Sequence, residues 1–123
     1  MADDMRQALV ERRELIEARA DAVLRGSLTD EAPWTADLGR EPRSEKQQKT
    51  AWWRAARTIA VYRDRYGITD DRTPFGPDPE STSQKIDAIH ARAALNRAHA
   101  ITNDEQSAQQ VRQTAAARPA RSL

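Results

Sequence analysis

The sequence of 123 residues contains no cysteine. A disulfide-stabilised fold, a thiol nucleophile and a cysteine-ligated zinc site are therefore excluded. Its apolar runs are all far shorter than the roughly 20 residues that a membrane-spanning helix needs. The first residues are acidic and lack the apolar stretch of a secretory signal. These absences predict a cytoplasmic protein that does not insert into a membrane.

Glycine and histidine are also scarce, with 4 and 2 residues. The glycines are scattered, so the sequence has no glycine-rich phosphate loop. His90 and His99 have no carboxylate partner at metal-ligand spacing, and no serine lies in the turn motif of a hydrolase nucleophile. We therefore expect no catalytic residue, no metal site and no cofactor, and thus a protein that is not an enzyme.

Charge and alanine dominate what is present. Charged residues make up 32% of the chain, yet the net charge is only +1. Hydrophobic residues reach 38%, below the about 45–50% of typical globular domains. Arginine supplies 17 of the 20 basic residues, and there are 22 alanines, a bias that GC-rich codons favour. This composition predicts a small, helical, alanine-rich core.

Apolar residues at seven-residue spacing predict the first helix over residues 3–25. Leu9, Ile16 and Val23 form the stripe that we expect to face the core. Gly26 follows at once and is typical of a helix C-terminal cap. In the connection to the next helix, Trp34 is the large aromatic that we expect to pack down onto the core.

The second helix is expected over residues 44–66, where Ser44 and Gln47 match a capping box. Gly67 follows and predicts a left-handed cap at the end of this helix. Because the first two helices are similar in length, we expect them to form an antiparallel hairpin. The core-facing residues of the second helix are predicted to be Trp52, Ile59, Tyr62 and Tyr66.

A third helix is expected over residues 82–102, starting at a capping box of Ser81 and Gln84. We expect residues 1–102 to form one small all-α domain, with the third helix packed on the hairpin. Residues 103–123 are a low-complexity tail, either a helical extension or disordered. The stripe expected to face the core consists of Ile86, Ile89, Ala93 and Ala100.

The near-neutral net charge of the whole chain conceals one strongly basic segment. Residues 43–65 hold seven basic and two acidic side chains, a net charge of +5. Such a stripe with an aromatic can bind a nucleic-acid backbone and stack a base. Alternatively it is a protein-docking face, or a solvated face whose arginines pair with acids of the first helix. The candidate interaction residues are Trp53, Arg54, Arg57, Arg63 and Arg65.

Several short motifs form a distinctive series along the chain. They are Pro33-Trp34, Leu38-Gly39 with Pro42, Trp52 with Arg54-Ala55, the segment from Val61 to Ile68 (VYRDRYGI), and Pro74-Phe75-Gly76-Pro77. This series resembles a region near the C-terminus of actinobacterial conjugative relaxases of the TrwC/MobF type, beyond their relaxase and helicase domains. The resemblance covers roughly residues 10–100, and the tyrosine–arginine segment is its specific part.

The resemblance implies a process rather than a reaction. The family nicks DNA with an N-terminal tyrosine and a histidine-ligated metal, and its helicase uses a Walker A loop; this sequence has neither a histidine cluster nor that loop. It therefore implies an accessory domain of conjugative DNA transfer that docks to a relaxase, a coupling protein or a secretion component. Nucleic-acid binding through the second helix is the alternative, and a homo-oligomer is a third possibility.

Overall fold

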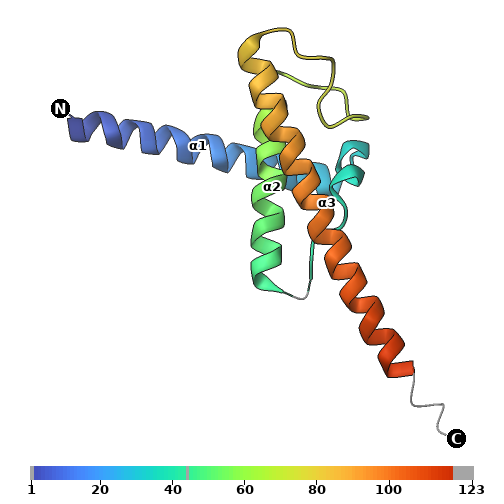
Figure 1. Cartoon of the computed structure of the whole chain (residues 1–123). Coiled ribbons are helices and arrows are strands. Elements are labelled where there is room, and N and C mark those ends of the chain that lie inside the picture. Colours follow the sequence, from blue (N-terminus) through green and yellow to red (C-terminus); the bar gives the residue numbers. More distant parts are fainter. Residues whose placement is uncertain (1, 44, 118–123) are drawn as a thin grey trace, which may run out of the picture.

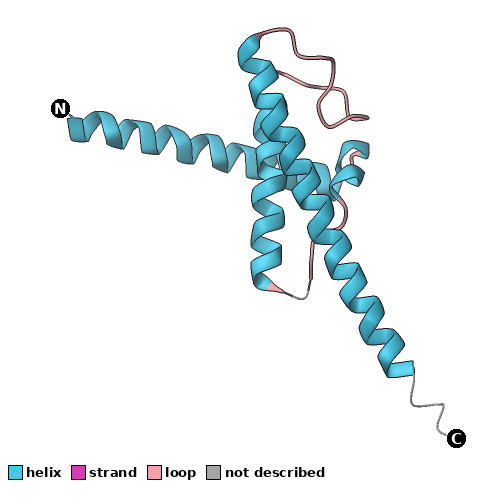
Figure 2. Cartoon of the chain, in the orientation of Figure 1, coloured by secondary structure: helices cyan, strands magenta, loops and turns pink. Residues whose placement is uncertain are grey.

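The computed structural model describes residues 2–43 and 45–117, and it contains helices and loops but no strand within these ranges (Figure 2). The predicted all-α class, with three main helices packed together, is confirmed. Helices α2 and α3 lie side by side in opposite directions, whereas α1 crosses α2 (Figure 1). The elements in order are α1 (Ala2–Thr29), the 3-10 helix η1 (Pro33–Leu38), α2 (Lys46–Arg65) and α3 (Thr82–Ala117).

None of the described helices combines the length and the apolar character that crossing a membrane requires.

Helix α1 continues past Gly26 for one further turn, so the predicted cap at this glycine is wrong. The helix ends at Thr29, and Glu31 in the following turn adopts a left-handed conformation with φ of 54°. The amide of Ala32 donates to the carbonyl of Ser27 at 2.9 Å, which closes the end of the helix. The extra turn allows Leu28 to pack against the core.

Gly67 ends α2 as predicted. Its φ of 60° lies in the left-handed region, and its amide donates to the Asp64 carbonyl at 3.3 Å. The Ile68 amide donates to the Arg63 carbonyl at 2.9 Å, which completes a Schellman motif. At the other end, Glu45 precedes the helix without a side-chain cap. The predicted box involving Ser44 lies outside the described residues.

Helix α3 begins at the predicted cap. The Ser81 hydroxyl accepts a hydrogen bond from the Gln84 amide at 3.0 Å, while the Gln84 side chain donates to the Tyr62 hydroxyl at 3.3 Å instead of returning to Ser81. The helix does not stop at residue 102 but continues to Ala117, which matches the helical-extension alternative for this part of the tail. Residues 118–123 of the predicted tail lie outside the described residues.

The core lies where the three helices and η1 meet. Trp34 and Trp52 are its largest side chains, with 1% and 0% of their surfaces exposed. Around them lie Leu24, Leu38, Ile59 and several alanines of α2 and α3. Trp34, Trp52, Ile59 and Tyr62 are thus buried as expected, and Tyr66 is half-buried beside Tyr62.

The predicted core stripe of α1 is wrong. Leu9, Ile16 and Val23 are 60%, 46% and 42% exposed. Helix α1 contacts the rest of the molecule only through its C-terminal half, where Ala20 and Leu24 are the buried residues. These two lie on an adjacent face, on average about 60° around the helix from the stripe at 100° per residue.

The predicted stripe of α3 is wrong as well, because Ile86, Ile89, Ala93 and Ala100 are exposed. The buried face is an alanine seam, which we define as Ala88, Ala91, Ala94 and Ala98. These residues recur every three or four positions and therefore share one face. Their small side chains let α2 and α3 approach closely.

The connection between η1 and α2 is fixed to α3. The Thr102 hydroxyl donates to the Arg40 carbonyl at 2.7 Å, and the Arg43 amide donates to Glu105 at 2.9 Å. A Cβ on Gly39, whose φ is 79°, would lie within 2.9 Å of the Thr102 side chain. The Leu38-Gly39 motif therefore has a structural reason, because only glycine permits this approach.

Candidate functional site

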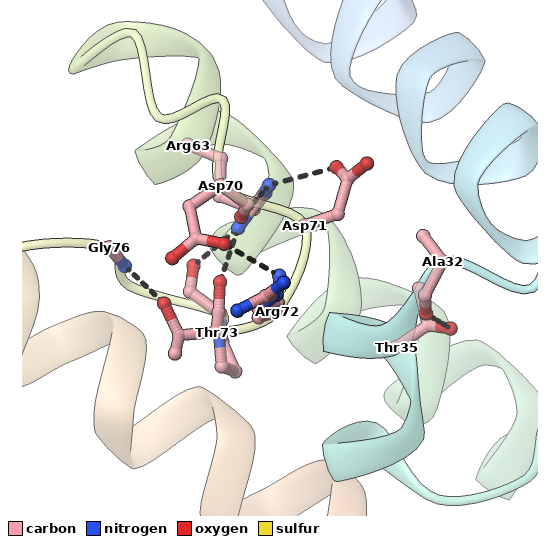
Figure 3. A network of polar contacts seen from close by, with 9 residues as sticks. Ala32, Thr35, Arg63, Asp70, Asp71, Arg72, Thr73 and Gly76 are labelled. Carbon is pink, nitrogen blue, oxygen red and sulfur yellow. Dashed lines mark hydrogen bonds and ion pairs between the residues drawn. The ribbon is translucent and has the colours of Figure 1, made fainter.

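The five candidate interaction residues do not form one surface. Arg63 is only 6% exposed, so its assignment to an exposed binding face is wrong. Its guanidinium donates to the carbonyl oxygens of Asp70 at 2.9 Å, Thr73 at 2.6 Å and Pro74 at 3.2 Å (Figure 3). Arg63 thus anchors the loop between α2 and α3 to helix α2.

Arg63 also connects this loop to η1. Its guanidinium carbon lies 4.7 Å from the centre of the Trp34 ring, a cation–π contact. Asp71 lies 3.8 Å from the guanidinium, and its carbonyl accepts the Trp34 amide at 2.7 Å. Burial lowers the pKa of Arg63, and the carboxylates of Asp71 and Asp70 oppose that shift. The role of Arg63 is therefore structural.

Arg65 lies at the end of α2, where it contacts α3. It forms an ion pair with Asp87 at 3.0 Å, and the Tyr66 hydroxyl donates to the same carboxylate. This hydrogen bond is the main cause that raises the pKa of Tyr66. Arg65 is 62% exposed, but its charge is already paired.

The remaining three candidates, Trp53, Arg54 and Arg57, lie in the middle of α2. An open hollow of about 540 Å³ forms beside them, and we call it the Trp53 hollow. Positions three and four residues apart share one face of a helix, which explains why this set lines one surface. The lining residues are Lys46, Lys49, Thr50, Trp53, Arg54 and Arg57.

Two of the four cations in the Trp53 hollow are neutralised by acids. Arg57 pairs with Asp21 of α1 at 2.7 Å, and Lys49 lies 3.6 Å from Glu41. Pairing with an acid of the first helix was one of the expected alternatives, and of the four candidates Glu11, Glu14, Glu17 and Asp21 it is Asp21 that pairs with Arg57. The side chains of Lys46 and Arg54 have no ion-pair partner among residues 2–43 and 45–117, so they carry the unpaired charge of the hollow.

Trp53 is a half-buried wall of the hollow. Its indole N–H donates to Glu41, and the Arg25 guanidinium carbon lies 5.8 Å from the centre of its ring. Its ring also meets Trp52 edge-on, with centroids 5.7 Å apart. The indole is therefore held in place by neighbours on several sides, which limits the ring face available to a stacking base.

Glu41 is the functional neighbour that sequence reasoning missed, whereas Asp21 was one of the four acids of the first helix expected to pair with these arginines. Glu41 is in a loop 12 positions before Trp53, and Asp21 is 36 positions before Arg57. No local spacing signals such contacts, because they depend on how α1 crosses α2. Together the two carboxylates reduce the basic stripe of residues 43–65 to a smaller cationic patch.

Within the described part of the chain, no group of three or more histidine, cysteine, aspartate or glutamate side chains is arranged to hold a metal ion. Comparison of the chain with known protein families, with curated proteins and with solved structures finds no match.

Proposed function

We propose that this protein is a non-enzymatic docking domain that binds a partner protein at the Trp53 hollow. The observation that carries the proposal is the unpaired, exposed Arg54 beside the half-buried Trp53. Tryptophan and arginine are the side chains most enriched in protein–protein hot spots, where an anchored aromatic is surrounded by polar groups.

The charges around the hollow favour a partner segment that carries carboxylates. Arg54 and Lys46 offer two unpaired cations on one helix face, and Thr50 lies between them. A carboxylate can accept a bidentate contact from a guanidinium such as that of Arg54. The fixed indole of Trp53 supplies an apolar wall that loses little conformational freedom on binding.

The motif series of the sequence supports a link to conjugative DNA transfer. Under this proposal the domain acts in the cytoplasm and docks to a relaxase, a coupling protein or a secretion component. The motifs themselves contribute to architecture: Arg63 holds the loop that carries Thr73 and Pro74, and a Cβ on Gly76 would lie 2.8 Å from Ile68. The proposal therefore places docking at the Trp53 hollow, which includes Arg54 of the series, and not at the tyrosine–arginine segment or the proline-rich motif.

Nucleic-acid binding is the second candidate, favoured by Lys46 and Arg54. Two observations weigh against it. Asp21 and Glu41 already neutralise Arg57 and Lys49, which leaves only two unpaired cations of the hollow for successive phosphates of a nucleic-acid backbone. The Trp53 indole is bonded to Glu41 and flanked by Arg25, whereas a stacking platform needs an open ring face.

The test is a calorimetric titration that measures the affinity of the purified full chain for purified relaxase, coupling protein and secretion components in turn. We expect one of them to bind, and Arg54→Glu to weaken that binding by about tenfold or more, since reversing a charge at a contact costs over 1.4 kcal/mol. Arg72→Glu is the matched control, because Arg72 is an exposed arginine of the loop between α2 and α3. It should leave the affinity unchanged.

Binding of none of these components, or equal loss in both variants, contradicts the proposal. Parallel titration with single- and double-stranded DNA over a range of salt concentrations tests the alternative. DNA binding whose salt dependence falls in Arg54→Glu but not in Arg72→Glu would replace protein docking with nucleic-acid binding.

A further inference from the structure

A second surface, separate from the Trp53 hollow, lies on α1. The N-terminal half of this helix projects away from the other elements (Figure 1), and every described residue from Ala2 to Ile16 is exposed. At 1.5 Å per residue this half extends about 22 Å. Isolated helices of such length are marginal in water, so packing against something else would stabilise it.

The projecting half carries most of an apolar row, which we call the α1 stripe. It consists of Met5, Leu9, Ile16 and Val23, which are 69%, 60%, 46% and 42% exposed. Spacings of four and seven residues place them on one line along the helix. This line lies beside the face that holds Ala20 and Leu24, so the contact of α1 with the other helices does not cover it.

Arginines lie on both sides of the α1 stripe. At 100° per residue, Arg6 and Arg13 fall on one side and Arg12 and Arg19 on the other. Arg19 pairs with Asp64 of α2 at 3.1 Å. Arg6, Arg12 and Arg13 have no ion-pair partner anywhere in the described ranges. The stripe therefore combines an apolar row with unpaired positive charge along its edges.

We infer that the α1 stripe is the docking surface for an amphipathic helix of another protein, whose own apolar row is flanked by aspartate and glutamate. Leu9, Ile16 and Val23 occupy one of the two seam positions of a coiled-coil heptad, and Arg12 and Arg19 occupy the other. A partner helix that places carboxylates opposite these arginines and apolar side chains opposite the row is therefore complementary to it. This inference does not rest on the function of the Trp53 hollow.

Two other occupants fit the stripe less well. A second α1 would bring Arg12 and Arg19 against the same arginines, and like charges across a seam are unfavourable. A lipid surface requires a wide apolar face with large anchors such as tryptophan or phenylalanine. The α1 stripe is only one residue wide, and α1 contains neither anchor.

The test uses a synthetic helical peptide of about three heptads, with leucine in the row that faces the α1 stripe and glutamate at the flanking positions. Its binding to the full chain is measured by fluorescence anisotropy, beside the same peptide with lysine in place of glutamate. We expect the glutamate peptide to bind about tenfold or more tightly than the lysine peptide, with an affinity that falls as salt is raised.

The variant Ile16→Ala should weaken binding of the glutamate peptide, and Arg12→Glu should weaken it further. Leu15→Ala is the matched control, because Leu15 is 71% exposed but lies on another face of α1. None of these side chains is buried, so we expect each variant to remain folded. A Tm equal to that of the parent protein in thermal unfolding will check this.

Three results would overturn the inference. The first is no binding of the glutamate peptide, or equal binding of the lysine peptide. The second is a dimer in light scattering that Ile16→Ala dissociates, which would assign the stripe to a second copy. The third is binding to phosphatidylglycerol vesicles that depends on Ile16 and exceeds binding of the peptide, which would assign the stripe to lipid.

Discussion

Arg63 shows how one side chain can order two distant connections. It is a charged residue in the middle of a basic segment, yet its guanidinium is buried and satisfied by three carbonyl oxygens of the following loop. A buried guanidinium needs such partners, because a charge moved out of water without them is strongly unfavourable. Once this contact forms, the loop has little freedom to adopt another path.

Replacing Arg63 should therefore destabilise the protein. In Arg63→Met three loop carbonyls lose their donor, and we expect the free energy of unfolding to fall by about 3 kcal/mol. Arg63→Lys should also lower the free energy of unfolding, but by less than Arg63→Met. An ammonium group keeps the positive charge but cannot reproduce the forked donors of a guanidinium. Urea unfolding followed by circular dichroism measures both changes.

Arg65→Met provides the comparison for Arg63, two positions along the same helix. Arg65 is 62% exposed, and its ion pair with Asp87 lies at the surface. Exposed pairs contribute roughly 0–1 kcal/mol, so this variant should stay close to the parent protein. Equal destabilisation by the Arg63 and Arg65 variants would contradict the structural role of Arg63.

Local sequence signals predicted some single residues and failed for others. Gly67 and Ser81 act through hydrogen bonds to residues at most five positions away, so their caps were predictable. Arg63 was misassigned because its burial depends on a loop that folds back over it. A run of basic residues on a helix does not show which of them will be buried by a loop that lies elsewhere in the sequence.

At the scale of elements, the α2–α3 contact depends on the alanine seam of α3. Alanine loses no side-chain rotamer freedom on burial and favours a helix. The seam therefore gives close packing at low entropic cost, while contributing little apolar area per residue. Larger side chains from α2 and η1, such as Trp52 and Leu38, supply most of the buried volume.

Enlarging a residue of the seam should separate the two helices. Ala94 is fully buried, and we expect Ala94→Leu to cost about 1–3 kcal/mol through overpacking. Ala93→Leu is the matched control, since Ala93 is exposed on the adjacent position and leucine is a good helix former. Thermal unfolding of both variants should show a lower Tm for Ala94→Leu alone.

The existence of the three helices and the buried face of α2 were predictable from apolar periodicity, but the buried faces of α1 and α3 were not. Leu9, Ile16 and Val23 form the stronger apolar row of α1, yet the body of the protein packs against Ala20 and Leu24 instead. In α3 the isoleucines at 86 and 89 face outward, and alanines face inward. Sequence reasoning assumed that the largest apolar residues of each helix face the core, whereas in α3 the isoleucines are exposed and the alanines are buried.

At the scale of the whole molecule, the chain consists of a compact centre with two projecting helical ends. The first half of α1 and the end of α3 leave the centre in different directions (Figure 1). All described side chains from residue 106 onward are exposed. Stability should therefore be concentrated in the region where α2, η1 and the middle of α3 meet.

Amide hydrogen exchange should report this gradient. We expect residues 88–102 of α3 to exchange about a hundredfold or more slowly than residues 106–115 of the same helix, because only the former pack against α2. Residues 2–16 of α1 should also exchange fast. Uniform protection along α3 would show that the projecting end is stabilised by contacts absent from the isolated chain, such as self-association.

The backbone bond between Trp34 and Asp71 has a consequence for how the protein folds. These residues are 37 positions apart in the sequence, and their hydrogen bond joins η1 to the loop between α2 and α3. The loop contains no helix or strand, and η1 is a single short 3-10 helix, so each segment depends on the other for its final conformation. We therefore expect the two connections to become ordered in a single late, cooperative step, after α2 and α3 have paired.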